Sequence, residues 1–164
     1  MSRKQSGFSL IELLVVIAVI LVIAAISIPA LLQSRVAANE ANAVASLRTV
    51  DTAQTTYSLN YPLVGFADDM KKLGPPPPGG STGAANADLV DWVLGCAAQP
   101  CLHSGYSFSI GNAVTTNGMI TDYTAYALPA HVKTTGNRGF CSGPDLHIKS
   151  DPTGGTNCTE NVPN

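Results

Sequence analysis

A single acidic side chain stands at the start of a long apolar segment. Glu12 follows the residues "SGFSLI", and the next charged residue along the chain is Arg35. Most of the residues between them are Leu, Val, Ile and Ala. An acid at the centre of a membrane costs roughly 2.5 kcal/mol or more and usually has a partner. The chemistry expected of Glu12 is therefore electrostatic pairing with a cation that the segment itself lacks.

The other reactive residue type is cysteine, and all four cysteines lie beyond residue 95. They fit two disulfides in an oxidising compartment better than a reduced cytosolic protein, and four cysteines allow three connectivities. We predict the pairs Cys96–Cys101 and Cys141–Cys158, because each closes a local loop. Zinc binding is disfavoured, because the spacings lack the paired C-x2-C pattern of a structural zinc site.

The remaining candidate side chains form no catalytic pattern. His103, His131 and His147 are dispersed in turn-rich sequence. Asp145 and Asp151 lie close to glycines, as in calcium loops, but miss the EF-hand spacing. The chain has no P-loop, no G-x-G-x-x-G and no G-x-S-x-G. We predict no enzymatic activity, no metal and no cofactor.

Composition divides the chain into two parts. Ten of the eleven prolines and fourteen of the fifteen glycines follow residue 60, whereas aliphatic residues and alanine dominate the first third of the 164 residues. The formal charge of -2 and the absence of a Lys/Arg cluster in the second part give no support for nucleic-acid binding by the head. We expect an N-terminal helical rod and a C-terminal head.

The apolar segment is long enough to cross a membrane. Residues 13–34 are uncharged, and a spanning helix takes roughly 20 residues. Arg3 and Lys4 precede the segment, which favours a cytoplasmic N-terminus and export of the remainder. A cleaved secretory signal needs only about 7 to 15 apolar residues, and neither that alternative nor a simple uncleaved anchor explains Glu12.

Lys4, Gly7, Phe8 and Glu12, followed by the apolar run, resemble the class III signal of type IV prepilins, of the type IVa-like kind, and of the related pseudopilins of type II secretion. The resemblance implies that a prepilin peptidase cuts between Gly7 and Phe8 and that Phe8 becomes the N-methylated first residue. The apolar helix then stays in the product. The lost leader carries Arg3 and Lys4, so the formal side-chain charge changes from -2 to -4.

The same resemblance implies roles in assembly. Glu12 would neutralise the Phe8 amine of a neighbouring subunit and so set the register, since a buried charge without a partner is heavily penalised. Pro29 removes a backbone donor and should kink or locally melt the helix. In the resembled family a proline at this place marks a segment that can unwind on assembly.

The expected fold class is α+β, with a long N-terminal helix and an antiparallel sheet head packed on its second half. The helix should cover residues 8–57. Strands are predicted at 106–110 and 122–128, with weaker candidates at 138–141 and 146–149. A short helix is predicted at 88–94, with Asp88 as N-cap and Trp92 in the core. Residues 74–83 should form an exposed loop.

The predicted domains are a leader (1–7), a transmembrane and filament-core helix (8–34), its amphipathic continuation (35–58) and a globular head (59–164).

The resemblance to type IV prepilins implies a structural subunit that polymerises with copies of itself into a type IV pilus for adhesion, motility or DNA uptake. The expected partners are the prepilin peptidase, an inner-membrane assembly platform and its ATPase. The precursor should sit in the inner membrane with its head in the periplasm, and the product in an extracellular filament. The alternatives are a pseudopilin of a type II secretion system and a minor pilin with a DNA-binding or adhesive tip.

Overall fold

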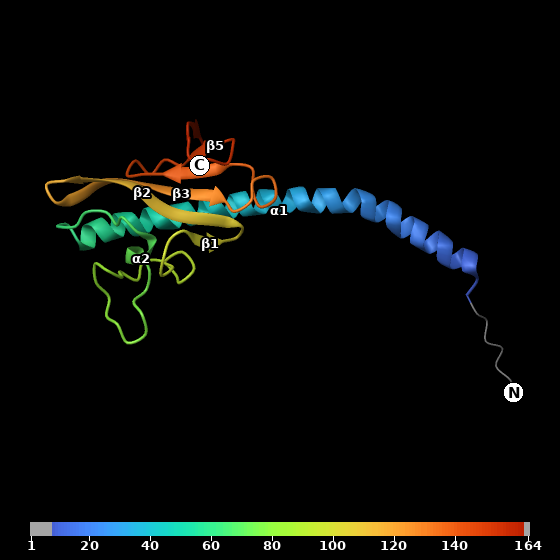
Figure 1. Cartoon of the computed structure of the whole chain (residues 1–164), viewed down its shortest axis with the longest axis horizontal. Coiled ribbons are helices and arrows are strands. Elements are labelled where there is room, and N and C mark those ends of the chain that lie inside the picture. Colours follow the sequence, from blue (N-terminus) through green and yellow to red (C-terminus); the bar gives the residue numbers. More distant parts are fainter. Residues whose placement is uncertain (1–7, 163–164) are drawn as a thin grey trace. The chain divides into compact units, whose positions relative to one another are not determined.

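The computed structural model describes residues 8–162, which form a long helix and an antiparallel sheet (Figure 1). The elements are two helices and six strands: α1 (Leu10–Asn60), α2 (Met70–Leu73), β1 (Cys101–His103), β2 (Tyr106–Thr116), β3 (Met119–Pro129), β4 (Gly139–Ser142), β5 (Lys149–Asp151) and β6 (Glu160–Asn161). The chain divides into two compact units, residues 1–35 and 36–164. The predicted α+β class with a sheet head is confirmed.

The sheet is a meander in which every strand pairs antiparallel with its neighbour in sequence, in the order β1-β2-β3-β4-β5-β6. Strands β2 and β3 are joined by Asn117 and Gly118, which have φ values of 51° and 84°. Positive φ at both central residues is the requirement of the tight hairpin turn that matches strand twist. The Asn-Gly pair therefore sets the register next to the turn, with Thr116 opposite Met119, and two register shifts between Gly111 and Thr115 separate these pairs from the rest of the hairpin.

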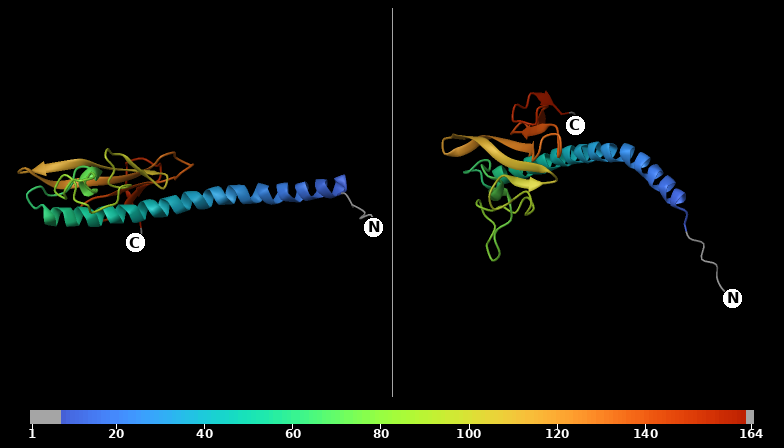
Figure 2. Two further views of the ribbon diagram at one scale, coloured as in Figure 1. Left: turned by 90° about the horizontal axis from the view of Figure 1, so that it is seen from below. Right: turned by 45° about the vertical axis from the view of Figure 1, so that its right-hand side comes forward.

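The second half of α1 lies along one face of the sheet, as the edge-on view in the left panel of Figure 2 shows. Its buried stripe follows a spacing of three and four residues, which places side chains on one helical face. The stripe consists of Glu40, Ala43, Leu47, Val50, Gln54 and Tyr57. Alternate residues of β2 and β3 belong to the same core, namely Tyr106, Phe108, Ile110, Tyr123, Ala125 and Ala127.

The prediction of a helix at residues 88–94 is wrong. The amides of Ala87 and Leu89 donate to the carbonyls of Lys72 and Leu73, at 2.8 Å each, and Asp88 has a positive φ of 56°. These bonds hold this part of the chain against the end of α2, and the positive φ of Asp88 is incompatible with a right-handed helix. Only one turn follows, and Asp91 caps it in place of Asp88, by accepting from the amides at 93 and 94.

The prediction that Trp92 lies in the core is also wrong, because its side chain is 62% exposed. It sits in the single turn that Asp91 caps. The close approach behind this turn involves Gly74 and Gly95, where a Cβ on either residue would overlap the backbone of the other. The side chains that this segment contributes to the core are Val90 and Leu94, and not the indole.

The strand predictions are confirmed for β2, β3 and β4, although β2 and β3 extend further than expected. The candidate at 146–149 is displaced, since β5 begins at Lys149. Leu146 has a φ of 58°, which interrupts an extended chain. The short edge strands β1 and β6 were not predicted, because three or two residues carry no readable alternation. The loop at 74–83 is largely exposed, as predicted.

Candidate functional site: the N-terminal segment and the apolar half of α1

The first described residues form a capped helix start. Phe8 and Ser9 precede α1, and the Phe8 side chain is 88% exposed. The Ser9 amide donates a hydrogen bond of 2.9 Å to Oε2 of Glu12. This is one half of a capping box, and a carboxylate in the first turn also complements the helix dipole. Gly7, and with it the predicted cleavage bond, lies outside the described residues.

The apolar part of α1 is exposed along its length. Its most apolar window has a mean hydropathy of 3.1, and none of that window is buried. In the described chain it is the one helix long and apolar enough to cross a membrane. Exposed apolar surface on this scale is a mark of lipid or protein contact. The helix is therefore compatible with membrane anchoring of a precursor.

Pro29 lies inside α1, and the helix is assigned without a break through this residue. The helix therefore does not melt at Pro29 in the single chain. A proline there cannot donate to the carbonyl four residues earlier, so this turn has one hydrogen bond fewer than its neighbours. The kink and the unwinding on assembly remain predictions.

Both predicted disulfides are present in the head. Cys96 and Cys101 are joined with a Cα–Cα distance of 5.6 Å, and Cys141 and Cys158 with 6.0 Å. The first bridge joins the segment before β1 to the first residue of β1, and the second connects β4 to the segment before β6. The described chain has no free cysteine.

Other candidates from the sequence have internal partners. Asp151 is buried, and its carboxylate accepts from the Thr153 hydroxyl at 2.6 Å and from the amides of Thr153 and Asn157, which lowers its pKa. Asp145 pairs with Lys149 at 3.1 Å. Among the residues that the structure describes, no group of three or more His, Cys, Asp or Glu side chains could hold a metal ion.

The outer face of the sheet carries an open hollow of about 850 Å³. Its lining is mainly polar and includes Asn112, Asp122, Tyr126, Asp145, His147 and Lys149. Tyr126 accepts a hydrogen bond of 2.5 Å from the Asn112 amide. Of the three histidines, only His147 lines this hollow. His103 is in β1 and His131 is in the β3–β4 loop, so the three histidines do not converge.

The structure buries several polar residues in the second half of α1, among them Glu40, Asp51 and Gln54. Glu40 is 8% exposed and receives the Arg138 guanidinium at 2.8 Å and the Asn137 amide at 2.9 Å. These contacts join the β3–β4 loop to the helix. The spacing of the apolar stripe was the signal that could have identified Glu40 and Gln54, because both occupy stripe positions.

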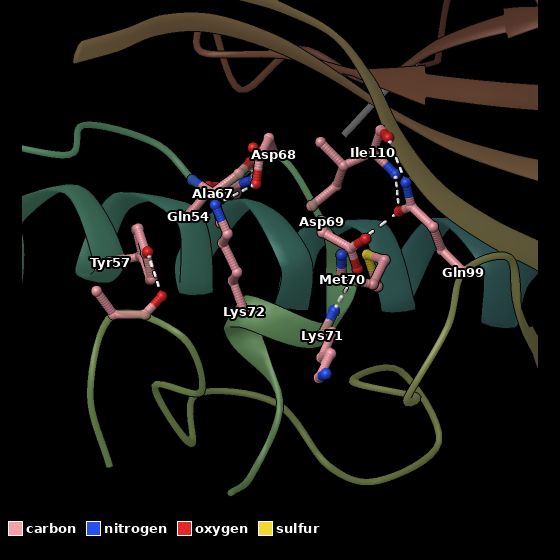
Figure 3. A network of polar contacts seen from close by, with 11 residues as sticks. Gln54, Tyr57, Ala67, Asp68, Asp69, Met70, Lys71, Lys72, Gln99 and Ile110 are labelled. Atoms are coloured by element: carbon pink, nitrogen blue, oxygen red, sulfur yellow. Dashed lines mark hydrogen bonds and ion pairs between the residues drawn. The ribbon is translucent and has the colours of Figure 1, made fainter. Parts of the chain in front are cut away.

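The side-chain amides of Gln54 and Gln99 each pair with the backbone of one residue, as a neighbouring strand would (Figure 3). The Gln54 amide donates to the Ala67 carbonyl and accepts from the Ala67 N–H, both at 2.8 Å. Gln99 makes the same pair of bonds with Ile110 of β2, both at 2.9 Å. Each side chain satisfies one backbone donor and one acceptor that would otherwise lack partners. The long segment between α1 and β2 is thereby tied to both.

Residues 2–28 match the model of the prokaryotic N-terminal methylation motif. This match supports the assignment of the N-terminal segment as a class III signal of the kind found in type IV prepilins. This motif supports a type IV pilin-like or pseudopilin subunit, and its family is structural and not enzymatic. It also implies processing by a prepilin peptidase and entry into pilus assembly. No curated protein and no solved structure matches the chain significantly.

Proposed function

We propose that this protein is a pilin, a structural subunit that is cut between Gly7 and Phe8, is methylated on Phe8 and polymerises into a type IV pilus. The observation that carries the proposal is the apolar half of α1, which lies largely within the residues matched by the methylation motif and has no buried residue in its most apolar window. The predicted borders belong to this proposal: leader 1–7, apolar helix 8–34, amphipathic helix 35–58 and head 59–164.

The apolar helix has two environments available in this scheme. Before assembly it lies in the inner membrane, with the N-terminus in the cytoplasm and the head in the periplasm. In the filament, identical helices surround it, so extraction exchanges one apolar medium for another. The assembly platform and its ATPase supply the energy for this exchange, because the subunit has no nucleotide-binding motif.

Glu12 supplies the register of the filament. Its carboxylate lies at the start of α1 and is the only charge of the apolar half before Arg35. Each incoming subunit presents the amine of Phe8, and pairing with Glu12 of a neighbour removes an unpaired charge from a low-dielectric core. A subunit one residue out of register leaves both charges unpaired.

The test is to isolate surface fibres from cells that express the chain and to identify the fibre subunit by mass spectrometry. We expect this chain as the main component, beginning at Phe8 and carrying one methyl group on its amine. Cells that lack the prepilin peptidase are the control, and they should retain residues 1–7 and make no fibres. Fibres without this chain, or a product with another first residue, would contradict the proposal. A chain that is processed at Phe8 but remains in the cell envelope would identify a secretion pseudopilin instead.

A further inference from the structure

A buried carboxylate connects α1 to β4. Asp51 is 5% exposed and lies on the side of α1 that faces the sheet. Its Oδ2 accepts a hydrogen bond of 2.7 Å from the Ser142 hydroxyl of β4. Its Oδ1 is buried and has no hydrogen-bond partner among the described residues. The contact therefore satisfies only one of the two carboxylate oxygens.

The groups that face Asp51 offer no positive charge. From β3 comes Tyr123, whose hydroxyl is buried and also lacks a hydrogen-bond partner in the described chain. From the loop after β4 comes Asp145, whose negative charge acts on both Asp51 and Tyr123. Asp122 of β3 acts on Tyr123. None of the ion pairs found in the described residues includes Asp51.

These surroundings favour the protonated, neutral form of the Asp51 carboxyl. Burial raises the pKa of Asp51 to about 6 from the ordinary 3.8, the Ser142 hydrogen bond opposes the rise, and the charge of Asp145 adds to it. A buried carboxylate with an unsatisfied oxygen is costly because it gives up its hydration without full replacement. A protonated carboxyl has a smaller cost and gains a donor.

We propose that the protonation state of Asp51 controls the packing of α1 against β4. The helix and the strand pack tightly when the Asp51 carboxyl is protonated, and their packing loosens when it is ionised. The ionised form requires a further donor at Oδ1, and water entering between α1 and β4 supplies it. Ser142 is next to Cys141, so the loosening extends to the base of the loop that the Cys141–Cys158 disulfide closes.

The direction of the pH dependence follows from the raised pKa. The folded head binds the proton of Asp51 more tightly than the unfolded chain does. The stabilisation is therefore fully present below the unfolded pKa of about 3.8 and is lost as the pH rises through about 6. The head should be held more tightly at pH 5 than at pH 7.5, which is opposite to the usual behaviour of a paired surface carboxylate.

The test is hydrogen–deuterium exchange of the full chain in detergent at pH 5 and pH 7.5, corrected for the intrinsic pH dependence of exchange. We expect β4, Gly139–Ser142, to lose roughly tenfold of its protection at the higher pH, since each pKa unit is a factor of ten in proton affinity. Asp51→Asn keeps the shape and cannot ionise, so its β4 protection should be equal at both values. Glu160→Gln, which removes an exposed acid of β6, is the matched control and should behave as the unaltered chain.

A second variant keeps the proposal testable if Asp51→Asn does not fold. Ser142→Ala removes the one donor that favours the ionised form, so the loosening should begin at higher pH than in the unaltered chain. Protection of β4 that does not change with pH in the unaltered chain would overturn the proposal. The same pH dependence in Asp51→Asn, or an unmoved midpoint in Ser142→Ala, would overturn it as well.

Discussion

Glu12 already has a hydrogen-bond partner in the single chain, the amide of Ser9. This changes how a substitution at position 12 must be interpreted, because loss of the carboxylate removes both a helix cap and a charge. Alanine removes both functions together. Glutamine keeps an oxygen that can accept from Ser9 but carries no charge.

We predict that Glu12→Ala and Glu12→Gln are both cleaved and that both assemble poorly, because the proposed register depends on charge. The measurements are the mass of the processed chain and the yield of sheared fibres. Leu13→Ala, a neighbouring change without charge, is the control and should assemble. Normal fibres from Glu12→Gln, with none from Glu12→Ala, would show that the cap and not the charge is what assembly requires.

Glu12 could be identified from the sequence because the next charged residue along the chain is Arg35. The sequence could not identify the partners of Asp51 or Glu40, because Ser142 and Arg138 lie more than ninety residues later. Such pairs are decided by the packing of the helix on the sheet. The spacing of the buried stripe indicates burial only for Glu40, because Glu40 occupies a stripe position and Asp51 does not.

At the scale of elements, the segment between α1 and β2 has little regular structure and depends on side chains for its position. α2 is a helix of only four residues, capped by Asp69. Gln54 binds this segment at Ala67, and Gln99 binds β2 from its other end. The sequence predicted an exposed proline-rich loop here but wrongly added a helix at 88–94, because it could not show that this chain is tied to the end of α2 and that Asp88 takes a positive φ.

We predict that Gln54→Ala lowers the free energy of unfolding by about 1–3 kcal/mol, because it leaves the buried N–H and carbonyl of Ala67 without partners. Thermal unfolding of the full chain in detergent measures the effect. Thr52→Ala is the control on the exposed face of α1, where the Thr52 hydroxyl binds the carbonyl of Arg48. This control should change stability by no more than about 0.5 kcal/mol. Equal stability of the two variants would contradict the role given to Gln54.

At the scale of the whole molecule, the chain consists of two units, of which the first exposes its apolar side chains and the second buries them in a core. Residues 1–35 include the exposed apolar part of α1, whereas residues 36–164 contain the core, both disulfides and the sheet. Composition alone predicted this contrast, since proline and glycine are concentrated after residue 60. The family match is confined to residues 2–28, which lie within the first unit.

We predict that the helix of the assembled subunit is interrupted near Pro29, where the single chain has none. The turn before a proline has one hydrogen bond fewer and is the weakest place in the apolar half. Cryo-electron microscopy of filaments measures this directly. Pro29→Ala should restore a continuous helix, whereas Ile28→Ala keeps the proline and should retain the break. An unbroken helix through residues 25–31 in the unaltered filament would contradict the prediction.

The meander order of the sheet has a consequence for export. Each strand pairs with the strands that come directly before and after it in the chain, so no strand has to wait for a partner beyond the next one. A chain that crosses a membrane from its N-terminus to its C-terminus delivers α1 first and then β1 to β6 in the order in which they join. The head can therefore close its sheet progressively as it emerges, and at each moment only one strand edge is still waiting for its neighbour. The last segment to arrive carries Cys158, so the bond to Cys141 fixes the C-terminal strands only after β5 is in place.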